Sequence, residues 1–316
     1  MTRLRGNGAA HAAFEAAVSG GHLHHAWLFA GPPGIGKATY ARDAAASLLA
    51  RAAGDATGDR TRALIEAGSH PDYRVLERLP KDGKPDGDLA RSITIAQVRT
   101  LQPMFATTPS LGPRRVVLID AVDDLERAGA NALLKNLEEP PEGTVFLLIS
   151  HAPGRLLPTI RSRCRLLRFE PLNGEEMLAA LGDLIPDASD EEREALVRSG
   201  GGSPGRALRF AGLELGRLDA ALGLIARDGD RTNQERVRLM RALSPKAAQA
   251  RYEAFLDRVP TFVAEQAPFR AGEALRTALD AYEESRALAA SARALSLDPA
   301  STVFELAGVV ARLARE

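Results

Sequence analysis

The sequence predicts an α/β domain with a mainly parallel sheet, followed by an all-helical region. In the first half of the 316-residue chain, short apolar runs alternate with helical patterns, which is typical of parallel sheets. From Pro171 onward no convincing strand occurs, and segments rich in Ala, Leu and Arg continue to Arg315. A glycine-rich turn lies between the first apolar run and a helical pattern, a position typical of phosphate loops. This length favours two or three domains with buried cores.

Five short apolar runs predict the strands of the sheet. They are Ala26–Ala30, Tyr73–Leu76, Val116–Asp120, Val145–Ser150 and Arg165–Phe169. Apolar side chains at i, i+3, i+4 and i+7 predict a helix over Glu126–Glu138, which Pro140 and Pro141 end. Residues 51–92 are rich in Gly, Asp, Arg and Pro, and we expect an irregular insertion there.

Three capping-box spacings predict the starts of further helices. They are Thr94 with Gln97, Ser189 with Glu192, and Thr232 with Glu235. The glycines between Gly200 and Gly205 predict a subdivision within the helical half.

The composition excludes several classes of protein. With 45% hydrophobic and 26% charged residues, the chain is too apolar to be intrinsically disordered. Cys164 is the only cysteine, so the chain forms no internal disulfide and no thiolate zinc cluster. No apolar run approaches the ~20 residues of a membrane helix, and no signal-peptide core follows Arg3 and Arg5. We therefore expect a cytoplasmic protein that does not bind a membrane.

Charge is divided unevenly along the chain, although the formal net charge is zero. Residues 1–170 hold 22 Lys/Arg and 18 Asp/Glu, whereas residues 171–316 hold 19 and 23, which indicates two unlike regions. One cluster of arginines occurs with no acidic residue between Glu142 and Glu170, namely Arg155, Arg161, Arg163, Arg165 and Arg168. We expect any anion site beyond the phosphate loop at this cluster.

The glycine-rich turn has the pattern of a phosphate loop, Gly31-Pro-Pro-Gly-Ile-Gly-Lys37. Its glycines, Gly31, Gly34 and Gly36, let the backbone curl so that N–H groups point inward, and Lys37 reaches the terminal phosphates. The hydroxyl that ligates Mg²⁺ is missing, because the next residue is Ala38. Thr39 follows, turned by about 100° around the helix. The sequence therefore predicts the loop's fold but leaves open whether it binds ATP or ADP with Mg²⁺ or is a turn without nucleotide.

The strand that ends at Asp120 places a carboxylate where such folds bind Mg²⁺. In ring-forming ATPases of the AAA+ class, an acidic residue directly afterwards polarises the attacking water, and here that position is Ala121. Asp123 and Asp124 are interpreted as solvated or helix N-terminal charges. We therefore expect ATP hydrolysis to be weak or absent.

Several other polar residues are candidates with a simpler structural interpretation. Ser150 or His151 could be the polar sensor that follows the strand in these ATPases, or an ordinary strand-end residue. Cys164 is interpreted as a buried packing residue, because nothing in the sequence supplies a base for it. A set of three histidines is interpreted as part of a structural loop rather than a metal site. These are His22, His24 and His25.

Longer motifs connect the chain to a known family. The first, Asn131-Ala-Leu-Leu-Lys-Asn-Leu-Glu-Glu-Pro-Pro141, is followed by a buried strand and then by Leu156-Leu-Pro-Thr-Ile-Arg-Ser-Arg-Cys164. Shorter motifs are His25-Ala-Trp, Gly68-Ser-His-Pro-Asp72 and Gly202-Ser-Pro-Gly-Arg206. Over residues 1 to about 210 the chain resembles the bacterial clamp-loader subunits of DNA polymerase III, and the shorter motifs sharpen the match to their delta prime branch.

The resemblance implies three domains and an inactive ATPase site. It implies an AAA+ (RecA-like) P-loop domain over 1–170, a helical lid over 171–212 and a helical collar over 213–316 that oligomerises. In active subunits a sensor arginine directly follows the residues Gly-Ser-x. Here Gly205 occupies the position of that arginine, and Arg206 comes one residue later. Many members hold zinc with four cysteines after the P-loop helix. Because Cys164 is the only cysteine of this chain, we expect it to hold no zinc.

The Ser162-Arg163-Cys164 motif matches the family's arginine finger. The resemblance implies that Arg163 neutralises charge on the γ-phosphate of a neighbouring subunit's ATP. The alternative is that loop carbonyls or solvent accept the hydrogen bonds of this arginine. Arg161 and Arg165 are interpreted as interface or solvated-strand charges.

The resemblance also implies the partners and leaves two rival functions open. A stationary, non-hydrolysing subunit would assemble with the gamma/tau ATPases and the delta subunit, and would reach the sliding clamp and primer-template DNA through the complex. It would belong to the DNA polymerase III holoenzyme without needing a cofactor of its own. The first rival is an active ATPase, a motor-type subunit or other P-loop NTPase that uses Lys37, Asp120 and Thr39. A P-loop kinase would need an acceptor-binding lid that the helical tail does not offer.

Overall fold

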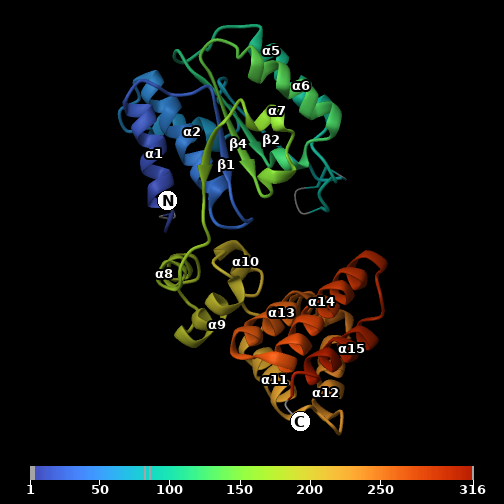
Figure 1. Ribbon diagram of the computed structural model, residues 1–316. Coiled ribbons are helices and arrows are strands. Elements are labelled where there is room, and N and C mark those ends of the chain that lie inside the picture. Colours follow the sequence, from blue (N-terminus) through green and yellow to red (C-terminus); the bar gives the residue numbers. More distant parts are fainter. Residues whose placement is uncertain (1–3, 82, 85–86, 315–316) are drawn as a thin grey trace. The chain divides into compact units, whose positions relative to one another are not determined.

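A computed structural model describes residues 4–81, 83–84 and 87–314, so Arg3 and the predicted helical residue Arg315 lie outside it. The chain separates into two compact units (Figure 1). One, here called the sheet unit, comprises Met1–Asp183 with Gly202–Pro204, and the other, the helical unit, comprises Leu184–Gly201 with Gly205–Glu316. The three-part boundaries at residues 170 and 212 stay a prediction. No helix in the described ranges is long and apolar enough to cross a membrane.

Five parallel strands form the centre of the sheet unit, in the order β2-β3-β4-β1-β5. They are β1 (Ala26–Ala30), β2 (Tyr73–Glu77), β3 (Arg115–Asp120), β4 (Thr144–Ser150) and β5 (Arg165–Arg168). All five predicted strands are confirmed to within a residue at each end. Because β1 lies between β4 and β5 while β2 and β3 lie beyond β4, the loop after β1 is at a point where the strand order reverses. Open parallel sheets bind their ligands at such points.

Helices cover both faces of the sheet (Figure 1). On one face, α1 (Gly8–Ser19) packs on the side chains of Trp27 and Phe29, and α2 (Lys37–Ala53) packs on Phe29 through Tyr40. Phe14 of α1 meets both rings edge-on, with centroids 5.0 and 5.7 Å away. Because side chains alternate along a strand, Leu28 faces the opposite core with Leu148 of β4. That second core is covered by α4 (Ile95–Arg99), α6 (Arg127–Glu138) and α7 (Pro158–Arg161).

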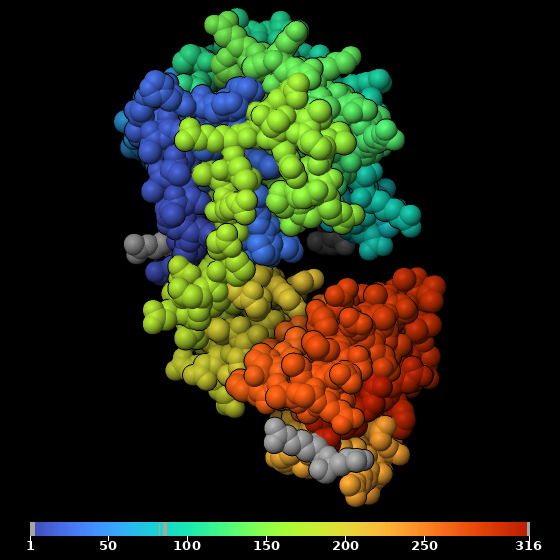
Figure 2. Space-filling view, viewed as in Figure 1, coloured from blue at the N-terminus to red at the C-terminus, as the bar shows by residue number. Residues whose placement is uncertain are grey.

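The segments before α1 and after β5 are joined by hydrogen bonds. The Asn7 side chain accepts from the backbone N–H of Glu170 (2.7 Å) and donates to its carbonyl (3.1 Å). Arg5 pairs with Asp183 at the end of α8 (Gly174–Leu184), with 2.8 Å between Nη2 and Oδ2. In Figure 2 the yellow-green surface of this later segment runs beside the blue N-terminal surface. These bonds fix the strand that lies next to β1.

Two predictions about local structure have different outcomes. The Thr94 capping box is confirmed, since Thr94 Oγ1 accepts from the Gln97 N–H (3.3 Å) and Gln97 Oε1 accepts from the Thr94 N–H (3.0 Å). The irregular insertion at 51–92 is wrong in part, because α2 runs to Ala53 and α3 occupies Asp59–Glu66. The Asp55 carboxylate accepts from the N–H groups of Gly58 and Thr61 and from the Thr61 hydroxyl, and these bonds hold the first turn of α3. Short polar side chains of this kind stabilise turns and helix starts.

The sheet unit also contains three shorter elements. They are α5 (Gln102–Phe105), η1 (Val122–Asp124) and η2 (Pro153–Arg155).

The helical unit contains no strand among its described residues, as the sequence predicts. Its helices are α9 (Asp190–Gly200), α10 (Pro204–Leu208), α11 (Leu215–Asp228), α12 (Gln234–Leu243), α13 (Gln249–Gln266), α14 (Gly272–Leu295) and α15 (Pro299–Ala311), with the short η3 (Lys246–Ala248) and η4 (Ala267–Phe269). The last helix, α15, contacts α11, α12, α13 and α14. Its buried side chains, including Val303, Leu306 and Val310, therefore form the centre of the bundle.

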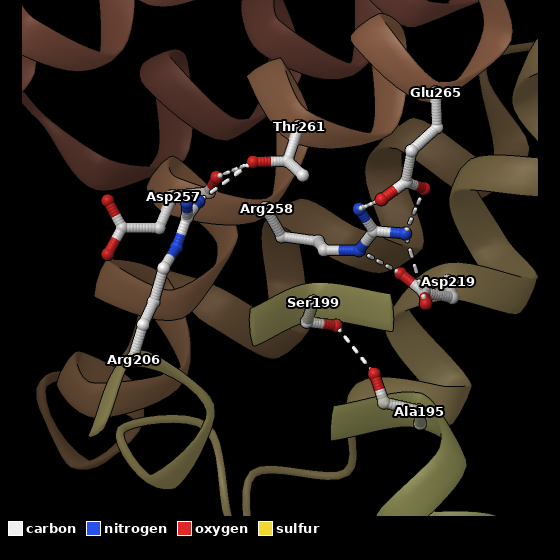
Figure 3. A network of polar contacts seen from close by, with 8 residues as sticks. All are labelled: Ala195, Ser199, Arg206, Asp219, Asp257, Arg258, Thr261 and Glu265. Atoms are coloured by element: carbon white, nitrogen blue, oxygen red, sulfur yellow. Dashed lines mark hydrogen bonds and ion pairs between the residues drawn. The ribbon is translucent and has the colours of Figure 1, made fainter. Parts of the chain in front are cut away.

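A buried ion-pair network joins α11 to α13 (Figure 3). Arg258 is 3% exposed and donates to Asp219 (2.6 and 3.2 Å) and to Glu265 (2.9 and 2.8 Å). The two carboxylates raise the pKa of Arg258 against the lowering effect of its burial. Buried guanidinium groups are stable when both ends are paired in this way.

Of the two capping boxes predicted in this unit, one forms in part and the other does not form. Ser189 caps α9 by accepting from the Glu192 N–H (3.1 Å), but the Glu192 carboxylate accepts from the Gly212 N–H (3.0 Å) instead of closing the box. The Thr232 box is wrong, because the buried Asp230 carboxylate accepts from the first N–H groups of α12. An ionised acceptor in this position outcompetes a threonine hydroxyl.

Candidate functional site

The glycine-rich turn connects β1 to the first residue of α2. Gly34 and Gly36 have φ values of +76° and +95°, in the left-handed region that favours glycine. The Gly31 N–H donates to the Ser150 carbonyl (3.2 Å), and a Cβ at Gly31 would lie 2.1 Å from the Phe169 carbonyl oxygen. The three predicted glycines are therefore placed where their lack of a side chain is required. The turn leads into the positive N-terminal end of α2, the arrangement that binds phosphate in other proteins.

Lys37 lies within this turn and is only 2% exposed. Its ammonium group donates to the carbonyls of Gly31 (2.6 Å) and Pro32 (2.5 Å). Burial lowers the pKa of Lys37 to about 8, against the opposing effect of the Asp120 and Asp123 carboxylates. A phosphate in the turn would have to replace these two neutral carbonyls as the acceptor of the Lys37 protons.

The residues expected to act on Mg²⁺ and water are only partly present. Asp120, at the end of β3, lies 3.9 Å from Nη2 of Arg42 on α2, and its side chain is 22% exposed. Ala121, which follows it, is buried and carries no acid. Ala38 and Thr39 are the second and third residues of α2, and Thr39 is exposed. The fold brings Lys37 and Asp120 together, but it places no hydroxyl directly after Lys37.

Asp123 has a different role from the one predicted. Its carboxylate accepts from the Ser150 hydroxyl (3.0 Å) and from the backbone N–H groups of His151 (2.8 Å) and Ala152 (3.1 Å). The interpretation as a solvated charge is therefore wrong for Asp123, because β3 and β4 are neighbours and their carboxyl ends meet. Asp124, in contrast, forms a half-exposed ion pair with Arg78 (3.1 Å).

Asp123 holds the two candidate sensor residues in place. The Ser150 side chain is fully buried, and its hydroxyl donates to Asp123. The pKa of His151 is lowered by burial and by the nearby Lys37 charge. Two consecutive aspartates before a helix usually interact with the helix N-terminus, so the sequence alone did not indicate this connection. The expected pairing of β3 with β4, which brings their carboxyl ends together, was the signal that could have identified the contact of Asp123 with Ser150 and His151.

Arg163 follows α7 and is paired within its own chain. Its Nη2 atom lies 2.7 Å from Glu138 Oε1 at the end of α6, and Nη1 donates to the Thr159 carbonyl (2.9 Å). The Arg163 side chain remains 33% exposed. This geometry matches the alternative interpretation, in which a loop carbonyl accepts a hydrogen bond from the arginine, and Glu138 adds an ion pair. Action of Arg163 on a neighbouring subunit's ATP remains a prediction.

The other arginines of the cluster lie in different surroundings. Arg161 donates to the Pro153 carbonyl (3.4 Å), and the guanidinium carbon of Arg165 lies 5.1 Å from the centroid of the Trp27 ring. Arg161 and Arg168 line a pocket of about 940 Å³ that also reaches Gly31 and His151. Two cations of the cluster are thus next to the phosphate loop.

The Gly202-Ser-Pro-Gly-Arg206 motif is divided between the two units. Ser203 Oγ donates to the Pro33 carbonyl of the phosphate loop (2.9 Å), and the Leu172 N–H donates to the Gly202 carbonyl (2.8 Å). Arg206, in the helical unit, donates to Thr261 Oγ1 (2.9 Å) on α13. The motif therefore contacts the loop through Ser203.

The cysteine and two of the three histidines have structural surroundings. Cys164 packs against the second core, and burial raises its pKa to about 12, so the thiol is protonated at neutral pH. His24 Nδ1 lies 2.9 Å from the Ala26 carbonyl oxygen, and His25 Nε2 lies 3.1 Å from that of Leu137. No group of three or more His, Cys, Asp or Glu side chains within the described ranges could hold a metal ion.

Comparison with known proteins shows similarity to one family. The family model described as DNA polymerase III, delta subunit, matches residues 6–173. The chain is 44% identical over 192 residues to DNA polymerase III subunit delta' of Pseudomonas aeruginosa, which covers 60% of this chain and 56% of that protein. It is 35% identical over 199 residues to subunit delta' of Escherichia coli, covering 61% and 56%.

A second group of relatives carries a different subunit name. The chain is 34% identical over 168 residues to DNA polymerase III subunit tau of Escherichia coli, covering 53% of this chain and 25% of that protein. The chain spans about half the length of the delta' relatives it matches.

Proposed function

This chain belongs to the DNA polymerase III delta subunit family, and from that premise we propose that it is the delta prime-type subunit of a bacterial clamp loader. In this role it assembles with gamma/tau-type ATPases and a delta-type subunit in the cytoplasm. It reaches the sliding clamp and primer-template DNA through that complex. The 44% identity to the delta' subunit of Pseudomonas aeruginosa supports the delta prime role.

The observation that carries the proposal of a non-hydrolysing subunit is an intact phosphate loop without its catalytic neighbours. The turn, Lys37 and Asp120 are in place, but Ala38 supplies no Mg²⁺ ligand and the buried Ala121 supplies no acid for water. At the position of the sensor arginine in the predicted lid, Gly205 carries no side chain. Loss of several groups that stabilise the transition state lowers phosphoryl transfer by many powers of ten.

Hydrolysis by the isolated chain tests this part. We expect no steady-state ATPase activity above that of Lys37→Ala, measured by phosphate release. A turnover near ~1 s⁻¹ that disappears in Lys37→Ala would contradict the proposal. Equilibrium binding of ATP and ADP, with and without Mg²⁺, separately tests whether the loop retains nucleotide. The subunit needs no zinc in this proposal, and metal analysis of the pure chain tests that point.

Arg163 is the residue through which this chain would act on a neighbour's ATP. The partly exposed pair with Glu138 is worth at most about 1 kcal/mol, so exchange of the carboxylate for a γ-phosphate costs little. A guanidinium fork spans two phosphate oxygens and an ammonium does not, so the role requires arginine. In a reconstituted complex, hydrolysis at the one adjoining ATP site is the measurement that tests the role.

The second candidate function is a motor-type ATPase of the same family. Two observations favour it, namely the similarity to subunit tau and the placement of Lys37 near Asp120. It requires the exposed Thr39 to replace the missing Mg²⁺ ligand. Thr39→Val would then abolish Mg²⁺-dependent hydrolysis, whereas in the non-hydrolysing subunit it changes nothing.

A further inference from the structure

A polar hollow is lined by residues of the helical unit. It has a volume of about 430 Å³ and lies between α10, α13 and α14. Three of its lining side chains are arginines, namely Arg206 from α10 and Arg286 and Arg293 from α14. Figure 3 shows Arg206 extending toward Thr261 and Asp257 on α13.

The positive charge of this hollow is only partly balanced. Arg293 pairs with Asp257 (2.6 Å) and with Glu253 (3.3 Å). Arg286 is exposed and has no carboxylate partner among the residues that the structure describes, and its guanidinium carbon lies 5.7 Å from the centroid of the Tyr282 ring. Asp257 is the one acidic side chain in the described lining. The hollow is therefore a cationic site in the acidic half of the chain, where residues 171–316 hold 19 basic and 23 acidic residues.

The chemistry of these groups matches a phosphate. Guanidinium groups bind phosphate oxygens through paired N–H donors, and an arginine next to an aromatic ring keeps those donors directed outward. Sites for single-stranded nucleic acid combine such cations with aromatic and guanidinium faces on which bases stack. We propose that this hollow binds a backbone phosphate of a single-stranded nucleic acid. The site is built from residues of the helical unit alone and goes beyond the proposed function.

The test measures binding of a fluorescein-labelled single-stranded oligothymidylate to the full chain by fluorescence anisotropy across a salt series. Arg286→Ala removes the exposed cation and is expected to weaken binding several-fold. It should also reduce the slope of log K against log salt by about 0.7, the value for one phosphate contact on a single strand. Arg206→Lys keeps the charge but loses the fork, and it should weaken binding without that change of slope.

The matched control is Arg241→Ala, which removes one exposed arginine from the same unit outside the hollow. It should leave both affinity and slope at the values of the unchanged chain. Titration with inorganic phosphate, followed by NMR of the arginine Nε–H groups, should shift Arg206 and Arg286 but not Arg241. Circular dichroism confirms that each variant is folded.

Three results would overturn the proposal. They are equal binding by Arg286→Ala and the unchanged chain, an equal loss in Arg241→Ala, and binding of polyglutamate but not of the oligonucleotide. The last result would assign the hollow to carboxylates of a protein partner. Assembly with the partner ATPases is measured on the same variants, so failure of this site is distinguishable from failure of the clamp-loader role.

Discussion

Arg163 and Glu138 form a 2.7 Å ion pair that joins the second residue after α7 to the last residue of α6. The two residues come from the two longest family-like motifs, so the pair connects the Leu-Glu-Glu-Pro-Pro segment to the Ser-Arg-Cys segment. An arginine held in this way is oriented in advance, and it loses less conformational freedom on binding a phosphate.

The first prediction concerns this arginine in the assembled complex. Arg163→Ala should leave assembly intact and lower hydrolysis at the adjoining ATP site by about 10³-fold or more, because a finger in trans supplies that much. Arg163→Lys should not restore the rate. Glu138→Gln, the matched control, should change stability by less than about 1 kcal/mol and keep hydrolysis. Unchanged hydrolysis in Arg163→Ala would show that the residue is structural.

The second prediction concerns Asp123. Asp123→Ala leaves the buried Ser150 hydroxyl and two backbone N–H groups without their acceptor, which should lower the free energy of unfolding by about 1–3 kcal/mol. Asp124→Ala removes only a half-exposed pair and should cost less than about 1 kcal/mol. Urea denaturation measures both. Equal losses in the two variants would show that the Asp123 hydrogen bonds add nothing to stability.

The third prediction concerns the pH dependence of stability. Because the pKa of Lys37 is about 8 in the folded chain and near 10.5 in a free lysine, the unfolded state binds more protons between these pH values. The contribution of Lys37 to stability therefore rises with pH across this window. Lys37→Met removes that contribution. The difference in unfolding free energy between the unchanged chain and Lys37→Met, followed from pH 7 to 10 by urea denaturation, should shift in favour of the unchanged chain.

Other groups titrate in the same range, so the difference between the two proteins is the informative quantity. Burial raises the pKa of Tyr73 to about 12, and its contribution to stability falls as the pH rises past 10. Since Tyr73 is present in both proteins, its contribution cancels in the difference. A difference that stays constant with pH would contradict the lowered pKa of Lys37.

The fourth prediction concerns the buried network in the helical unit. Arg258→Ala leaves the partly exposed carboxylates of Asp219 and Glu265 without their cation, and it should lower the free energy of unfolding by about 1–3 kcal/mol. Arg241→Ala, on the surface of the same unit, should stay within about 0.5 kcal/mol. Thermal and urea unfolding check both values. A small loss in Arg258→Ala would mean that water reaches the two acids.

Most of the architecture could be predicted because it depends on local patterns. Buried parallel strands are short apolar runs, and α6 carries an apolar stripe that two prolines end, so β1 to β5 and α6 lie where the sequence places them. Local patterns failed where another residue supplied the hydrogen bond. Asp230 replaced the predicted Thr232 cap, and Asp55 ordered α3 inside the expected insertion.

The sequence by itself determined the phosphate loop, the missing groups at Ala38 and Ala121, and the family motifs, because each of these is a matter of residue type at a fixed spacing. Only the tertiary structure decided the partners of the charged side chains. Asp123 binds the end of β4, Arg163 binds Glu138, and Lys37 binds the carbonyls of its own loop. The physical reason is that a charged group takes the nearest acceptor or donor in space, and the pairing of strands and helices brings together residues that are distant in the chain.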